Sequence, residues 1–175
     1  MLTLHKLALG IVLLVAATAA AAQQSEVYRL AAGDQLVISV FGEADLSMNV
    51  TLPHDGILKY PFLGDIRVTG LTAPELERAI ADGLRGDYLV NPEVTVTIQG
   101  FRPFFLNGEV NRPGSYEYQA GLTLEKALAL AGGLSPRAAR GKIEVRRANS
   151  DSFERIGMSD PVYAGDVINV PQSFF

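Results

Sequence analysis

The chain has 175 residues, of which 48% are hydrophobic and 19% are charged, and its formal net charge is −4. This length allows one or two small domains with a real hydrophobic core. The acidic balance argues against a non-specific nucleic-acid-binding protein, which needs a basic surface, and the absence of cysteine excludes disulfides and thiolate metal sites.

Residues 1–22 have the pattern of a secretory signal peptide. Lys6 precedes an apolar run over residues 7–17, which is too short to span a bilayer comfortably. The alanines at 20–22 stand directly before Gln23 and fit the small-residue rule for cleavage. A retained membrane anchor is the alternative, but the chain becomes polar directly after these alanines. We therefore expect an exported protein that begins at Gln23 after cleavage.

The pattern between residues 28 and 100 predicts short strands, one helix and a returning strand. Apolar residues alternate in short stretches that turn residues separate. Thr72 and Glu75 match a capping box, so we expect a helix to begin there and to end near Gly86. We expect the buried stripe of this helix to consist of Leu76, Ala79, Ile80 and Leu84.

Residues 104–134 predict a compact unit of strand, turn, strand and helix. An apolar strand leads into a Pro-Gly turn at 111–114, and a second short strand over 115–118 follows. Thr123 is a typical N-cap, and a double glycine at 132–133 ends the helix. This unit suggests a small β-grasp-like domain. The helix should bury the residues at i, i+3, i+4 and i+7, which are Leu124, Ala127, Leu128 and Ala131.

The carboxylates of the chain mostly adjoin glycine, which favours a role in turns over catalysis. Aspartate beside glycine usually bonds the backbone of its own turn. The mature chain has one histidine, His54, and no G-x-S-x-G nucleophile motif, phosphate loop or dinucleotide fingerprint. We therefore expect no enzymatic activity, no catalytic residue, no cofactor and no metal site. The carboxylates in question are Asp34, Asp55, Asp65, Glu109 and Asp166.

Two further features bear on the organisation of the chain: a repeated Ala-Gly-Asp sequence and a difference in charge between its two halves. Ala32-Gly33-Asp34 and Ala164-Gly165-Asp166 each precede an apolar strand, and we interpret both as one turn-into-strand device. Residues 23–100 carry 5 basic and 11 acidic side chains, whereas residues 101–175 carry 9 basic and 8 acidic ones. The boundary between the two halves falls near residues 100–103.

The order of these motifs resembles the bacterial outer-membrane polysaccharide export family. Its soluble-ligand-binding β-grasp domain has the succession Gly-Glu-Val, Pro-Gly, Tyr, Thr and Ala-Gly-Gly-Leu, which is found here over residues 108–134. Its N-terminal domain is similar to residues 28–98, and the resemblance covers nearly all of 28–171. The N-terminal positions that carry it are Gly33, Asp34, Asp55, Gly56, Pro61, Gly64, Gly70, Thr72, Tyr88, Pro92 and Val94.

We therefore expect an α+β protein with a signal peptide (1–22), an N-terminal mixed polysaccharide-export domain (23–100) and a β-grasp domain (101–175). The resemblance implies a periplasmic protein, associated with the outer membrane, that takes part in export of capsular polysaccharide or exopolysaccharide. It also implies a homo-oligomeric ring that serves as a conduit and docks on an inner-membrane polysaccharide co-polymerase. Long family members are often lipoproteins with a C-terminal outer-membrane helix. This chain shows neither feature, so we expect a separate outer-membrane protein, such as a β-barrel, to complete the pore.

A site for polysaccharide has better candidates than an active site. Sugar rings stack on aromatic faces, and sugar hydroxyls pair with planar polar groups. Tyr116 and Tyr118 share one face of an expected strand, beside Arg112 and Glu109, and these four residues are our candidate contacts. The alternative is that the tyrosines only cover the core with their hydroxyls in water.

Two further alternatives concern partners and function. The basic segment 137–155 faces either an acidic polymer or the acidic N-terminal half of a neighbouring subunit, unless it is simply a solvated face. A periplasmic module that binds sugar or assists assembly without forming a conduit is the second functional hypothesis. A carbohydrate-processing enzyme is the third.

Overall fold

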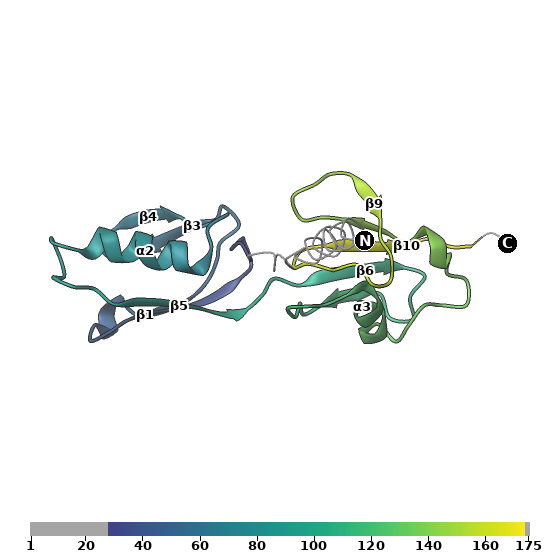
Figure 1. Cartoon of the computed structure of the whole chain (residues 1–175), viewed down its shortest axis with the longest axis horizontal. Helices are drawn as coiled ribbons and strands as arrows, with labels where there is room; N and C mark the ends of the chain where they lie inside the picture. The colour runs from purple at the N-terminus through teal and green to yellow at the C-terminus, as the bar shows by residue number, and fades with distance from the viewer. Residues whose placement is uncertain (1–27, 174–175) are drawn as a thin grey trace, which may run out of the picture.

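The computed structural model describes residues 28–173, which form two groups of elements along the long axis of the molecule (Figure 1). Each group surrounds its own cluster of buried hydrophobic side chains, one running from Leu30 to Val96 and the other from Phe104 to Val170. Helices and sheets occur in both, which confirms the predicted α+β class. The expected signal peptide and cleavage site lie outside the described residues. Within residues 28–173, no helix is long and apolar enough to cross a membrane.

A three-stranded antiparallel sheet forms the base of the first group. Its strands are β1 (Gln35–Val40), β2 (Met48–Thr51) and β5 (Val94–Gly100), with β1 in the centre. A short 3-10 helix, η1 (Ala44–Leu46), separates β1 from β2. Successive side chains of a strand point to opposite faces. The alternation along β1 therefore buries Leu36, Ile38 and Val40.

A hairpin and a helix complete the first group. β3 (Ile57–Tyr60) pairs with β4 (Gly64–Arg67) in an antiparallel hairpin. The predicted capping box is present at the start of α2 (Ala73–Leu84): the Glu75 N–H donates to Thr72 Oγ1, and the Thr72 N–H donates to the Glu75 carboxylate. These two hydrogen bonds satisfy backbone groups that the helix itself leaves unpaired.

The buried face of α2 differs from the prediction at one position. Leu76, Ile80 and Leu84 are buried as expected, but Ala79 is exposed. Buried residues follow one another at intervals of four along this helix. At about 3.6 residues per turn, the positions three and four residues after Leu76 lie on opposite sides of it around the helix axis. Ile80, four residues on, lies on the buried side, and Ala79, three residues on, lies on the other. Ala79 therefore lies at the edge of the stripe, where water reaches it.

The second group is built on a five-stranded mixed sheet. β6 and β10 are parallel neighbours in its centre, and the other neighbouring strands are antiparallel. Parallel neighbours need a long connection, and here the connection contains α3 (Leu124–Leu130) and η2 (Arg140–Lys142). The strands in order across the sheet are β7 (Gly114–Tyr116), β6 (Phe104–Gly108), β10 (Val167–Val170), β8 (Glu144–Arg146) and β9 (Phe153–Arg155).

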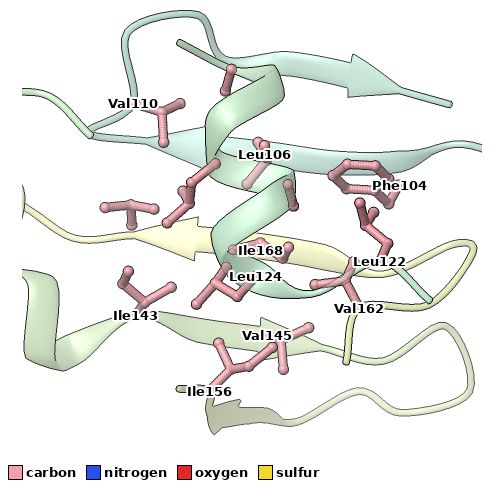
Figure 2. Close-up of a cluster of buried hydrophobic side chains, with 14 residues drawn as sticks. Phe104, Leu106, Val110, Leu122, Leu124, Ile143, Val145, Ile156, Val162 and Ile168 are labelled. Carbon is pink, nitrogen blue, oxygen red and sulfur yellow. The ribbon is translucent and has the colours of Figure 1, made fainter. Parts of the chain in front are cut away.

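Helix α3 lies across one face of this sheet, and the second hydrophobic cluster fills the space between them (Figure 2). Thr123 is the N-cap, as predicted, and its side chain accepts from the Lys126 N–H. All four residues of the predicted stripe are buried, and they are Leu124, Ala127, Leu128 and Ala131. A helix packed on a mixed sheet with a parallel central pair is the arrangement expected of a β-grasp domain.

Candidate functional site

Two of the four candidate residues lie where the chain between β6 and β7 meets the end of α3. The backbone N–H of Arg112 donates to the carbonyl of Ala131, and its Nη2 donates to the carbonyl of Leu130 at 2.9 Å. The hydroxyl of Tyr116 donates to the carbonyl of Arg112, and its ring stacks on Phe104 with 5.8 Å between centroids. A cation that bonds the last carbonyls of a helix stabilises its negative end. Arg112 therefore caps α3, and Tyr116 fixes the backbone of Arg112.

Glu109, the third candidate, follows β6 directly. Its carboxylate accepts a short hydrogen bond from the Ser135 hydroxyl. Its backbone N–H donates to the carbonyl of Val170, and its own carbonyl accepts from the Ser135 N–H. Glu109 thus joins β6, β10 and the loop after α3.

Tyr118 lies apart from the other three. β7 ends at Tyr116, so the two tyrosines do not share the face of one strand as we expected. The ring of Tyr118 meets Phe101 edge-on at 5.4 Å, and Phe101 meets Tyr28 at 4.8 Å. These three rings form a row between the two groups of elements. The structure therefore brings Arg112 and Tyr116 together and places Tyr118 at the junction. Contact of any of the four candidates with polysaccharide stays a prediction.

At the junction, a buried aspartate binds an arginine that is distant in the sequence. Asp34 is fully buried in the turn before β1, and its Oδ2 accepts from the Ala31 N–H at 2.8 Å. Arg102, just before β6, donates its backbone N–H to Oδ1 at 2.9 Å, and its Nη1 lies 3.3 Å from Oδ2. The hydroxyl of Tyr28 donates to Oδ1 as well. Burial and the hydrogen bond to Asp34 raise the pKa of the Tyr28 phenol.

The second Ala-Gly-Asp sequence is built in the same way. Asp166 is buried in the turn before β10, and its Oδ2 accepts from the Tyr163 N–H and, at 2.7 Å, from Nη1 of Arg147. Burial raises the pKa of the Asp166 carboxyl, and these two hydrogen bonds offset the rise only in part. Burial lowers the pKa of Arg147, but its hydrogen bonds to Glu154 and Asp166 outweigh that effect and leave it raised.

The turn role expected for the aspartates holds at three of them. Asp34 and Asp166 each bond the backbone three residues earlier, and Asp55 Oδ1 accepts from the Ile57 N–H at 3.0 Å. The two arginine partners were missed by sequence reasoning. The repeated Ala-Gly-Asp pattern was the signal that the two aspartates share a role, but nothing in it identifies a distant cation. Within residues 28–173, no group of three or more histidine, aspartate or glutamate side chains has the arrangement of a metal site.

The two arginines also line an open hollow between the two groups. It has a volume of about 290 Å³. On one side it is bounded by residues 31–32 and His54, and on the other by residues 146–149 and Gly165. Its charged and polar lining consists of Arg102, Arg146, Arg147, His54 and Asn149.

The chain matches two known families in succession. The family of polysaccharide biosynthesis/export proteins matches residues 22–99, and the SLBB domain matches residues 103–158. The chain is 31% identical to the exopolysaccharide production protein ExoF of Rhizobium meliloti over 138 residues, which are 72% of this chain and 33% of that protein. It is 29% identical to the EPS I polysaccharide export outer membrane protein EpsA of Ralstonia nicotianae over 106 residues, 59% of this chain and 28% of that protein. The chain thus spans about a third of the length of these relatives.

Proposed function

Because the chain belongs to the polysaccharide export family, we propose that it takes part in the export of a capsular polysaccharide or exopolysaccharide. The observation that carries this proposal is the succession of the export domain and the SLBB domain over residues 22–158. The family consists of transport components and not of enzymes, as we predicted. Our proposal is therefore that the protein guides finished polymer and neither makes nor breaks a glycosidic bond.

The location in this proposal is the periplasm, next to the outer membrane. Residues 1–22 act as a cleaved signal peptide, and the mature protein begins at Gln23. One relative is named as an outer membrane protein, which supports an envelope location. The intact mass of the protein recovered from the periplasm tests the cleavage. A mass that includes residues 1–22 would contradict it.

We also propose that residues 23–100 and 101–175 are two domains that work in a ring of identical subunits. Two separate hydrophobic clusters support the division. The acidic balance of the first half and the basic segment 137–155 favour contact between neighbouring copies. The ring forms a conduit between an inner-membrane co-polymerase and a separate outer-membrane protein. Light scattering of the purified mature protein tests this: a closed oligomer favours a conduit, whereas a monomer that still binds sugar favours the alternative of a simple sugar-binding module.

Within each subunit, Glu109, Arg112, Tyr116 and Tyr118 remain our proposed polysaccharide contacts. Exposed parts of their side chains would contribute ring faces and hydrogen-bonding groups beyond those that the fold uses. Because Arg112 and Tyr116 also hold the end of α3, sugar binding at this point would be coupled to the stability of the helix end.

The export role is tested by deletion of the gene. We expect the deletion strain to lack surface polymer while its membranes keep normal glycosyltransferase activity, because synthesis does not depend on this protein. The polymer should be trapped in the periplasm or held back at the inner membrane. Normal surface polymer in a deletion strain with no second exporter would contradict the proposal.

A further inference from the structure

The arginines that line the hollow at the junction make its lining positively charged. Three arginines line it, and no carboxylate is among its lining residues within the described part of the chain. Asp34, which pairs with Arg102, and Asp166, which pairs with Arg147, are 0% and 1% exposed. Glu154, the second carboxylate paired with Arg147, is exposed but is not among the lining residues of the hollow. A ligand that enters the hollow therefore meets guanidinium groups in its lining and no carboxylate.

Arg146 differs from the other two arginines of the hollow. Arg102 is bound to Asp34, and Arg147 is bound to Glu154 and Asp166. Arg146 forms no ion pair with any carboxylate of residues 28–173, and its guanidinium lies 5.9 Å from the centroid of the Phe153 ring. The ring orients the guanidinium without neutralising it. Arg146 thus contributes a positive charge that the fold leaves without a counterion.

Arginine fits one class of ligand particularly well. Its planar guanidinium presents a fork of donors that matches the two oxygens of a carboxylate. Asn149 and His54, in the same lining, offer donors and acceptors suited to hydroxyl groups. The volume of about 290 Å³ lies near the lower limit of small-ligand pockets, so it suits one sugar unit and not a chain segment.

We propose that this hollow binds the carboxylate of an acidic sugar unit, such as a uronic acid, in the polymer that the protein handles. The statement that this sugar unit belongs to the exported polymer rests on the proposed function in polysaccharide export. Arg146 is the residue that binds the carboxylate of the sugar. Arg102 and Arg147, through their ion pairs, hold the surrounding turns in place. Because the hollow lies between the two groups of elements, a bound acidic unit also contacts both of them.

Titration calorimetry of the purified protein with an oligosaccharide of glucuronic acid tests this proposal. The neutral glucose oligosaccharide of equal length and inorganic phosphate serve as comparison ligands. We expect the wild type to bind the acidic oligosaccharide and not the neutral one. Arg146→Gln should weaken this binding at least about tenfold, because hydrogen bonds to charged groups contribute strongly. The matched control is Lys142→Gln, which removes the same charge from an exposed position of the same basic segment outside the hollow.

The control should change the affinity less than about twofold, since an exposed charge at a distance is screened by salt. An equal loss in Lys142→Gln would show diffuse attraction and overturn the proposal, as would unchanged affinity in Arg146→Gln or the absence of binding. Tighter binding of phosphate than of glucuronate would make the hollow a small-anion site and also overturn it. If Arg146→Gln does not fold, Arg146→Lys replaces it, and we expect a several-fold loss because lysine lacks the fork. Export in the deletion strain is a separate measurement, so failure here leaves the export proposal intact.

Discussion

Nη1 of Arg102 lies 3.3 Å from the fully buried carboxylate of Asp34, although 68 residues separate them in the sequence. The arginine precedes β6 and the aspartate precedes β1. Their contact therefore links the first group of elements to the second at the starts of these two strands. Gly165, in the turn before β10, makes room for the arginine: a Cβ there would lie 2.7 Å from Arg102 Nε. The side chain of Arg102 thus pairs with the turn before β1 and lies close to the turn before β10.

Removal of the arginine should destabilise the protein. Arg102→Ala leaves the buried Asp34 carboxylate without its cation, and breaking a buried pair on one side typically costs about 3–5 kcal/mol. Three other hydrogen bonds remain on that carboxylate, from the Tyr28 hydroxyl and the backbone N–H groups of residues 31 and 102, so we expect the lower end of this range. Urea unfolding measures the change in the free energy of unfolding.

The control for this prediction is Arg85→Ala. Arg85 lies 2.7 Å from Asp82, but both side chains are more than half exposed. Pairs of this kind contribute less than about 1 kcal/mol. Equal losses in the two variants would show that the junction pair has no special role.

Gly108 should not tolerate a side chain. Its φ is +83°, and a Cβ there would lie 2.1 Å from the carbonyl oxygen of Val170 on the neighbouring strand β10. We expect Gly108→Ala to lose about 2 kcal/mol or more of stability, because backbone strain and the close approach to β10 add together. Gly121→Ala is the matched control: its φ is +79°, but nothing lies within 4 Å of the new Cβ. Thermal unfolding of both variants separates the close contact from the strain, and equal melting temperatures would exclude the contact.

The capping box of α2 should make stability depend on pH. The hydrogen bond from the Thr72 N–H is the main cause that lowers the pKa of the Glu75 carboxyl. A carboxyl whose pKa is lower in the folded state contributes stability above its unfolded pKa of about 4.3, and this contribution is lost as the pH falls through the folded value.

Glu75→Gln keeps the box and removes only the charge, since glutamine also accepts at this position. The wild type should therefore be more stable than this variant at neutral pH, and the difference should shrink on acidification to about pH 3. Urea unfolding at both pH values gives the two differences. A difference that is the same at both would mean that ionised Glu75 does not favour the folded state.

The tyrosines offer a test of sugar contact against a purely structural role. Replacement of both Tyr116 and Tyr118 by phenylalanine keeps the rings but removes the hydrogen bond from Tyr116 to the Arg112 carbonyl. We expect this pair to cost about 1 kcal/mol of stability and to retain most of the affinity for oligosaccharides of the native polymer. The alanine pair should lose that affinity. An alanine pair that remains folded and binds as tightly as the wild type would remove both tyrosines from the proposed site.

Local structure was predictable here because its causes are local. Thr72 and Glu75 stand three residues apart, and this spacing alone defines the capping box that the structure contains. The stripe of α3 likewise follows from helical periodicity. The prediction for Tyr118 was wrong because the sequence pattern of a strand continues to residue 118, whereas β7 ends at Tyr116. No periodicity links Asp34 to Arg102, so their pairing, and with it the hollow beside them, appears only when both halves are folded.

The amount of surface polymer made by single amide variants tests most directly the claim that this protein exports polysaccharide without catalysis. In the deletion strain, the only gene copy carries Asp34→Asn, Asp55→Asn or Asp65→Asn. An amide keeps the shape and one acceptor of a carboxylate but cannot act as a general base or a nucleophile. We expect every variant that accumulates folded protein at the wild-type level to restore surface polymer. Loss of export in such a variant, with fold and assembly intact, would contradict the account by giving that carboxylate a chemical role.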